Sequence, residues 1–129
     1  MCAIAIKYTN QQMETYQYNS LTELLLTLIK ERPGMYLGTA QISKLPNFIL
    51  GYEFCSNISQ TKPDFYFGEN GFIEWYTSRY RPGQKSYWQD YFLEESGNDE
   101  HKALQLYFTR LEEYYNWYKL RLAEQTETK

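Results

Sequence analysis

The side chains that most often carry catalysis are few in this sequence and lie far apart. His101 is the only histidine, and Cys2 and Cys55 are the only cysteines. A Ser–His–Asp or Cys–His site needs its histidine in a sheltered cleft, whereas His101 follows Asp99 and Glu100 at the start of a charged helical segment. One histidine and two distant cysteines also give neither a zinc quartet nor a thiol-redox pair. We therefore expect no metal site and no cofactor, and we expect both thiols to be reduced.

The acidic residues do not form an acid–base pair either. They occur as sequence neighbours at Glu94–Glu95, Asp99–Glu100 and Glu112–Glu113. Adjacent residues on a helix point about 100° apart, so they do not face each other. The glycines stand singly, outside any GxGxxG or GxxxxGKS/T pattern that would bind phosphate. The sequence thus predicts a protein that is not an enzyme, and an enzyme with a site hidden from the sequence is the weakest alternative.

The overall charge and the aromatic content point towards protein binding. The formal net charge is −3, which argues against a direct nucleic-acid binder because such a protein usually carries a basic stripe. An acidic protein suits a cationic partner, and toxins that cut nucleic acid are commonly cationic. The chain also has 14 tyrosines and an aromatic fraction of 19%. Tyrosine combines an apolar ring with a polar tip, so it serves half-buried positions and interfaces well.

Four carboxylates bracket the Ser96-Gly97 turn and form the first candidate partner-binding site: Glu94, Glu95, Asp99 and Glu100. At the rim of an interface, such a corner would speed association with a cationic partner. For Asp99 and Glu100 we prefer the structural alternative, in which acids at the positive end of a helix stabilise that helix.

Three aromatic residues form the second candidate partner-binding site, because each lies beside an apolar helix stripe rather than within it: Trp75, Tyr114 and Trp117. Rings at such positions are expected to stay partly exposed. Exposed tryptophan and tyrosine are enriched in binding hot spots, so Trp117→Ala should weaken partner binding and leave the fold intact. The alternative is that the helices pack around a broad hydrophobic centre and bury these rings too.

The elements that position these residues are mostly helical. Ser20 and Glu23 form a capping-box pattern, and an apolar stripe at helical spacing follows, which predicts a helix over residues 21–31. Arg32-Pro33-Gly34 ends it, because a proline disfavours helix at the residue before it. We expect Pro33, Gly34, Met35 and Leu37 to form a turn that locks this helix onto the next, with Met35 and Leu37 buried.

Apolar periodicity predicts four further helices, and a loop over residues 57–70 separates two of them. The predicted helices span residues 43–56, 71–80, 87–95 and a long last helix from Asn98 or Asp99 to about residue 123. We therefore predict an all-α fold: one compact domain over residues 1–129, built as a bundle of about five helices. Residues 1–19 form a lead-in strand or loose arm, and residues 124–129 form a frayed tail. An α+β fold is the alternative if Ala3–Tyr8 pairs with Phe65–Phe67.

The string Arg32-Pro33-Gly34-Met35-Tyr36-Leu37-Gly38 is the most individual part of the sequence. With Phe48, Gly51, Trp75, Trp88 and the aromatic last helix, it resembles small bacterial immunity-type proteins encoded beside polymorphic and contact-dependent growth inhibition toxins. The similarity spans about residues 20–116.

This resemblance implies an immunity protein that neutralises a cognate toxin domain by blocking its active site or its access to a target. An adaptor or regulatory module that binds a different protein is the alternative function. The apolar run at the start is too short for a signal segment, and no stretch of eighteen apolar residues occurs. We therefore expect a cytoplasmic protein that binds no membrane.

Overall fold

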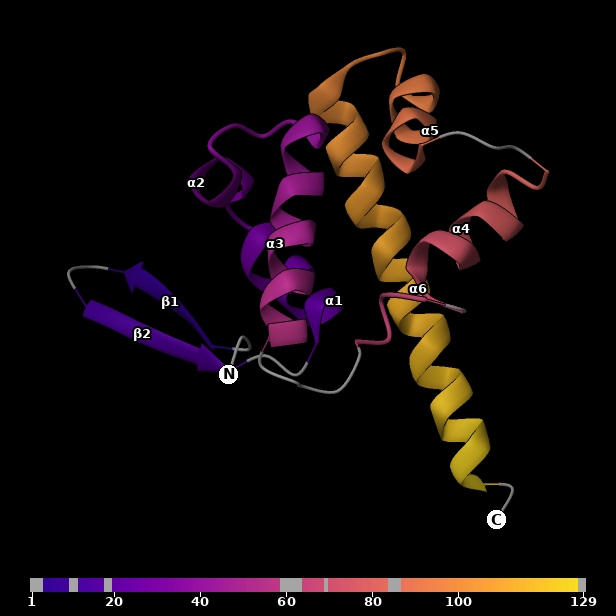
Figure 1. The fold of residues 1–129 in the computed structure, drawn as a ribbon, viewed down its shortest axis with the longest axis horizontal. Helices are drawn as coiled ribbons and strands as arrows, with labels where there is room; N and C mark the ends of the chain where they lie inside the picture. Colours follow the sequence, from indigo (N-terminus) through magenta and orange to yellow (C-terminus); the bar gives the residue numbers. More distant parts are fainter. Residues whose placement is uncertain are drawn as a thin grey trace.

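The computed structural model describes residues 4–9, 12–17, 20–58, 64–68, 70–83 and 87–127. The chain folds as a compact all-α bundle, which confirms the predicted fold class (Figure 1). Its helical elements are α1 (Leu21–Leu24), the π-helical turn η1 (Leu25–Ile29), α2 (Pro33–Leu37), the 3-10 turn η2 (Ile42–Lys44), α3 (Leu45–Ile58), α4 (Phe72–Tyr80), α5 (Trp88–Glu95) and α6 (Glu100–Glu127).

A two-stranded hairpin precedes the bundle and lies to one side of it (Figure 1). Strands β1 (Ile4–Thr9) and β2 (Gln12–Gln17) pair antiparallel, with Ile4 opposite Gln17. The expected strand at the N-terminus is therefore present. The alternative pairing of Ala3–Tyr8 with Phe65–Phe67 is wrong, because β1 has a nearer partner in β2 and a hairpin needs only a short connection.

The predicted first helix forms, but its second half widens into a π turn. The Ser20 Oγ accepts a hydrogen bond from the Glu23 amide at 3.1 Å, as the capping pattern predicts. An Asp64 carboxylate oxygen accepts a second bond from the Leu21 amide. The Lys30 amide donates to the Leu25 carbonyl at 2.8 Å, five residues back.

Helix α6 is the scaffold of the core and contacts η1, η2, α4 and α5. Its buried face consists of Ala103, Leu104, Tyr107, Phe108, Leu111 and Tyr114. The Tyr107 and Tyr66 hydroxyls lie 2.6 Å apart, and the Tyr114 hydroxyl donates to the carbonyls of Phe65 and Asn70 at 2.9 and 3.0 Å. These bonds satisfy the polar tips of the tyrosines, which is why full burial of such rings is tolerated.

The structure corrects two local predictions. Pro33–Leu37 forms the short helix α2 rather than a turn, and none of its residues is buried: Met35 is 52% exposed, while Leu37 is half-buried against the core. Pro33 at the first helical position starts this helix, and Gly38 ends it with a φ of +89°. Helix α6 continues to Glu127, so residues 124–127 are helical and not a frayed tail, because Glu and Gln favour helix.

Two further observations concern the redox state of Cys55 and the capacity of the helices to span a membrane. Cys55 on α3 is disulfide-bonded, which contradicts the expectation of reduced thiols for this residue; Cys2 lies outside the described residues. Among the described residues, no helix combines the length and the apolar character needed to cross a membrane.

Candidate functional site

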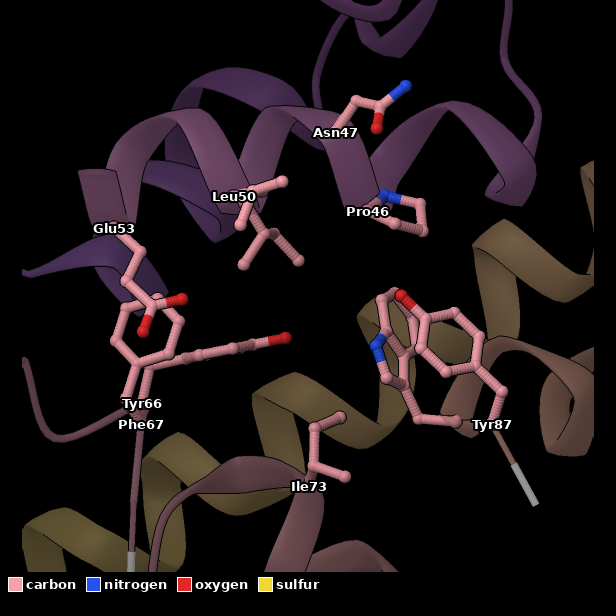
Figure 2. Close-up of a pocket in the computed structure, with 10 residues that line it drawn as sticks. Pro46, Asn47, Leu50, Glu53, Tyr66, Phe67, Ile73 and Tyr87 are labelled. Atoms are coloured by element: carbon pink, nitrogen blue, oxygen red, sulfur yellow. The ribbon is translucent and has the colours of Figure 1, made fainter. Parts of the chain in front are cut away.

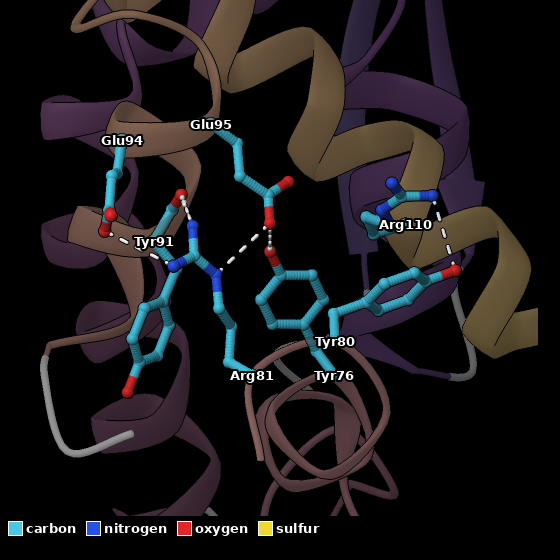
Figure 3. Close-up of polar contacts among 7 residues, drawn as sticks. All are labelled: Tyr76, Tyr80, Arg81, Tyr91, Glu94, Glu95 and Arg110. Carbon is cyan, nitrogen blue, oxygen red and sulfur yellow. Dashed lines mark hydrogen bonds and ion pairs between the residues drawn. The ribbon is translucent and has the colours of Figure 1, made fainter. Parts of the chain in front are cut away.

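The first candidate site, at the α5–α6 turn, is tied to α4 by an arginine (Figure 3). Arg81 follows α4 and reaches across to α5, where its Nη1 and Nε lie 3.3 Å from a Glu94 oxygen and 3.2 Å from a Glu95 oxygen. Its Nη2 also donates to the Tyr91 carbonyl at 3.2 Å. One positive charge from within the chain therefore already lies against two of the four carboxylates at this corner.

The two neighbouring glutamates differ in what they do. The Glu95 oxygen that meets Arg81 also accepts a hydrogen bond from the Tyr76 hydroxyl at 3.2 Å. Burial, and then the Glu95 charge, raise the pKa of Tyr76 to about 12. The Glu94 side chain is 70% exposed and that of Glu95 only 29% exposed. Glu94 is thus available to a partner, whereas Glu95 joins α5 to α4.

Asp99 takes the structural role that we preferred for it, and Glu100 contacts a distant segment of the chain. An Asp99 carboxylate oxygen accepts the amides of His101 and Lys102 at 3.1 and 3.0 Å, which caps the start of α6. The Lys102 amide contributes most to lowering the pKa of Asp99 below its usual range. Glu100 accepts a hydrogen bond from the Ser43 hydroxyl at 3.1 Å. Partner binding by these two residues stays a prediction.

The second candidate site is less exposed than its sequence position suggests. Trp75 and Tyr114 are buried, so the expectation of partial exposure is wrong for both, while Trp117 is half-buried. The broad hydrophobic centre that we weighed as the alternative is what buries them. Helix α4 packs on α6 with Trp75 facing Tyr114 at 5.5 Å between ring centroids.

Trp75 and Trp117 nevertheless lie side by side, with ring centroids 6.2 Å apart. They line a cavity of about 300 Å³ with Arg79, among others. The Arg79 guanidinium lies 5.5 Å from the Trp75 ring, and that of Arg121 lies 5.2 Å from the Trp117 ring. The protein's own arginines therefore already lie over both rings.

A different cavity, of about 280 Å³, lies between α3 and the start of α5 (Figure 2). Leu50 extends into it from α3, and Tyr87 stands at the opposite wall. Its lining consists of Pro46, Asn47, Ile49, Leu50, Glu53, Tyr66, Phe67, Ile73, Tyr87 and Trp88. Leu50 and Tyr87 are more than half exposed, and so is Phe54, one turn beyond Leu50 on α3.

Sequence reasoning missed the surface around the α3–α5 cavity, although one signal for it was present. Leu50 and Phe54 are four residues apart, so they share a helix face, and that face differs from the one that carries the buried Leu45 and Ile49. Two large apolar residues on the outer face of a helix are unusual in a monomer. The approach of Tyr87 to this helix depends on tertiary packing, which no local pattern reveals.

Comparisons with known protein families, with characterised proteins and with solved structures gave no match.

Proposed function

We propose that this protein is an immunity-type protein that binds a cognate bacterial toxin domain and blocks its active site or its access to a target. The observation that carries the proposal is the apolar surface beside the α3–α5 cavity. Leu50, Phe54 and Tyr87 are all more than half exposed there. Contiguous apolar patches on folded proteins commonly mark sites that bind other proteins.

The net charge of the chain supports a cationic partner, and the Arg32–Gly38 string supports a toxin as that partner. The chain has a net charge of −3, and an acidic surface speeds association with a cationic protein, such as a nuclease. The string that resembles immunity-type proteins lies in and around α2, of which nothing is buried. Met35 of this string is 52% exposed, so a partner can contact the string there.

The proposal assigns the protein to the cytoplasm, where a toxin that cuts nucleic acid would act. Disulfides are rare in that compartment, so the bond at Cys55 should not be needed for binding. We expect a Cys55→Ser variant to neutralise the toxin as well as the parent protein does. Loss of neutralisation in a folded variant would argue for an oxidising compartment instead.

Co-expression with the product of the adjacent gene, where that gene encodes a toxin domain, tests the proposal. We expect a stoichiometric complex and relief of growth inhibition. A Leu50→Glu, Phe54→Glu double variant should lose both while keeping its melting temperature. Leu120→Glu on α6 is the matched control, because Leu120 is 67% exposed and Phe54 is 66% exposed.

Three outcomes separate the possibilities. Relief of inhibition that the double variant abolishes and the control keeps supports the proposal. A toxin that remains active and unbound contradicts it. Co-purification with a protein that is not a toxin would favour the adaptor function, since the same surface serves both.

A further inference from the structure

The α3–α5 cavity has aromatic and aliphatic walls and one acidic group. Of the described residues that line it, Glu53 alone is charged. Figure 2 shows its side chain extending from α3 towards the rings of Tyr66 and Phe67. Glu53 makes no ion pair or hydrogen bond with any described residue. Glu53 is half-buried beside these apolar walls, and a carboxylate at such a position forms a charge-assisted contact with a cationic group placed next to it.

Elsewhere the chain shows how it accommodates a guanidinium between a carboxylate and a ring. Arg110 lies 4.2 Å from the centroid of the Tyr80 ring, and its Nη1 lies 2.9 Å from a Glu113 oxygen. The α3–α5 cavity offers the same two components. It has one carboxylate, that of Glu53, and it has aromatic rings from tyrosine and tryptophan. No lysine or arginine from the described part of the chain lies over Tyr87 or Trp88.

We infer that the α3–α5 cavity receives an arginine side chain of the protein partner. The guanidinium would pair with the Glu53 carboxylate beside the rings of Tyr66 and Phe67, and its aliphatic stem would pack against Leu50 and the opposite wall at Tyr87. Arginine fits better than lysine, because a planar guanidinium both stacks on aromatic rings and pairs with a carboxylate through two bonds.

The size of the cavity agrees with this occupant. Its volume of about 280 Å³ lies at or below the lower end of the range that holds drug-sized ligands, roughly 300–1,000 Å³. One long side chain therefore suits it better than a nucleotide or another large cofactor. The inference rests on the proposed function for its partner, but the preference for a guanidinium is a property of this chain alone.

Titration with n-butylguanidinium tests that preference without the toxin, and neutral n-butylurea is the matched probe. The readout is the indole N–H resonance of Trp88, assigned with a Trp88→Phe variant. We expect a saturable shift with a Kd of about 1 mM, as is reasonable for so small a ligand. Butylurea should bind at least tenfold more weakly, because it lacks the charge that Glu53 recognises.

Two glutamine variants locate the site. Glu53→Gln keeps the size of the side chain and should weaken guanidinium binding at least tenfold at an unchanged melting temperature. Glu74→Gln is the control, because Glu74 lines the other cavity, where Arg79 already supplies a cation. Equal binding of butylurea, or binding that Glu53→Gln leaves unchanged, would overturn the inference.

The same variants separate this inference from the proposed function. If the toxin complex forms and Glu53→Gln weakens it at least tenfold, both stand. If the complex forms with unchanged affinity in Glu53→Gln, the partner does not use the cavity and only the inference is overturned. If no toxin complex forms while butylguanidinium still binds, the proposed function fails on its own.

Discussion

At the scale of single residues, Glu95 joins two helices through one carboxylate oxygen, which meets both Arg81 and the Tyr76 hydroxyl. Hydrogen bonds to a charged group contribute about 1.5–3 kcal/mol when they are sheltered. Because this side chain is 29% exposed, we expect Glu95→Ala to lower the free energy of unfolding by about 1–2 kcal/mol in urea denaturation.

Glu94 provides the control for this experiment. Its contact with Arg81 is an exposed ion pair, and such pairs contribute about 0–1 kcal/mol. Glu94→Ala should therefore change the unfolding free energy by roughly 0.5 kcal/mol or less. Equal losses in the two variants would show that Glu95 does not join α4 to α5. For the same reason Glu94→Lys, rather than Glu95→Lys, is the clean test of the acidic corner in toxin association.

Asp99 allows a test of capping against charge. Asp99→Ala removes the acceptor of the His101 and Lys102 amides and should lower the melting temperature. Asp99→Asn keeps an acceptor and should restore most of it. The folded-state pKa of Asp99 is lowered, so its contribution is present above the usual value near 3.8 and is lost as pH falls through the lowered pKa. If Asp99→Asn lowers the melting temperature as much as Asp99→Ala does, the charge of Asp99 matters rather than its capping bonds, and the capping prediction is wrong.

At the scale of elements, α2 makes the clearest stability prediction. Leu37 is half-buried against the core and Met35 is exposed. Leu37→Asp should lower the unfolding free energy by about 1–2 kcal/mol, because only part of the side chain leaves an apolar environment. Met35→Asp should change it by roughly 0.5 kcal/mol or less. A loss of several kcal/mol from Leu37→Asp would indicate that Leu37 is fully buried, as the sequence predicted.

The sequence predicted the helices best where two kinds of signal agreed. Capping groups and apolar periodicity coincide at Ser20, and a proline and glycine stop coincides with the end of a stripe at Pro82-Gly83. The prediction failed at Pro33, where the same proline that ends one helix begins the next. The local sequence carries both meanings, and only the packing of Leu37 onto the core decides between them.

The candidate site was harder to predict, because exposure depends on packing between elements. Trp75 and Tyr114 lie beside their own helix stripes, but each is buried where α4 crosses α6. Leu50 and Glu53 belong to one helix, yet the cavity that they line needs Tyr87 from a distant segment. Helical periodicity shows which face of a helix is apolar, and it does not show which faces meet.

At the scale of the whole molecule, buried phenols make the fold sensitive to alkali. Burial is the main cause that raises the pKa of six described tyrosines above the usual value near 10: Tyr52 and Tyr76 to about 12, Tyr66, Tyr107 and Tyr114 further, and Tyr115. Their contribution to stability is fully present below the unfolded pKa near 10. It is lost as pH rises through the folded pKa values.

We therefore expect stability to fall steeply above about pH 10. For the fully buried Tyr66 and Tyr107, each proton that only the unfolded chain releases costs ~1.4 kcal/mol per pH unit. Tyrosinate absorbance should appear together with the loss of helical signal. The Tyr107→Phe variant lacks one of these titrating hydroxyls, so its free energy of unfolding should fall less steeply with pH. Tyrosinate that forms while the helices persist would contradict the prediction.

The closeness of Trp75 and Trp117 has a spectroscopic consequence. Their rings are 6.2 Å apart and inclined by 41°, a geometry that couples the two indole transitions and gives paired circular-dichroism bands of opposite sign. These bands fall where the helical backbone also absorbs, so helix content read from the spectrum would be distorted. Trp117→Phe removes the coupling between the two indoles and should abolish the paired bands. The paired bands would also report separation of α4 from α6 during unfolding, independently of the melting of either helix.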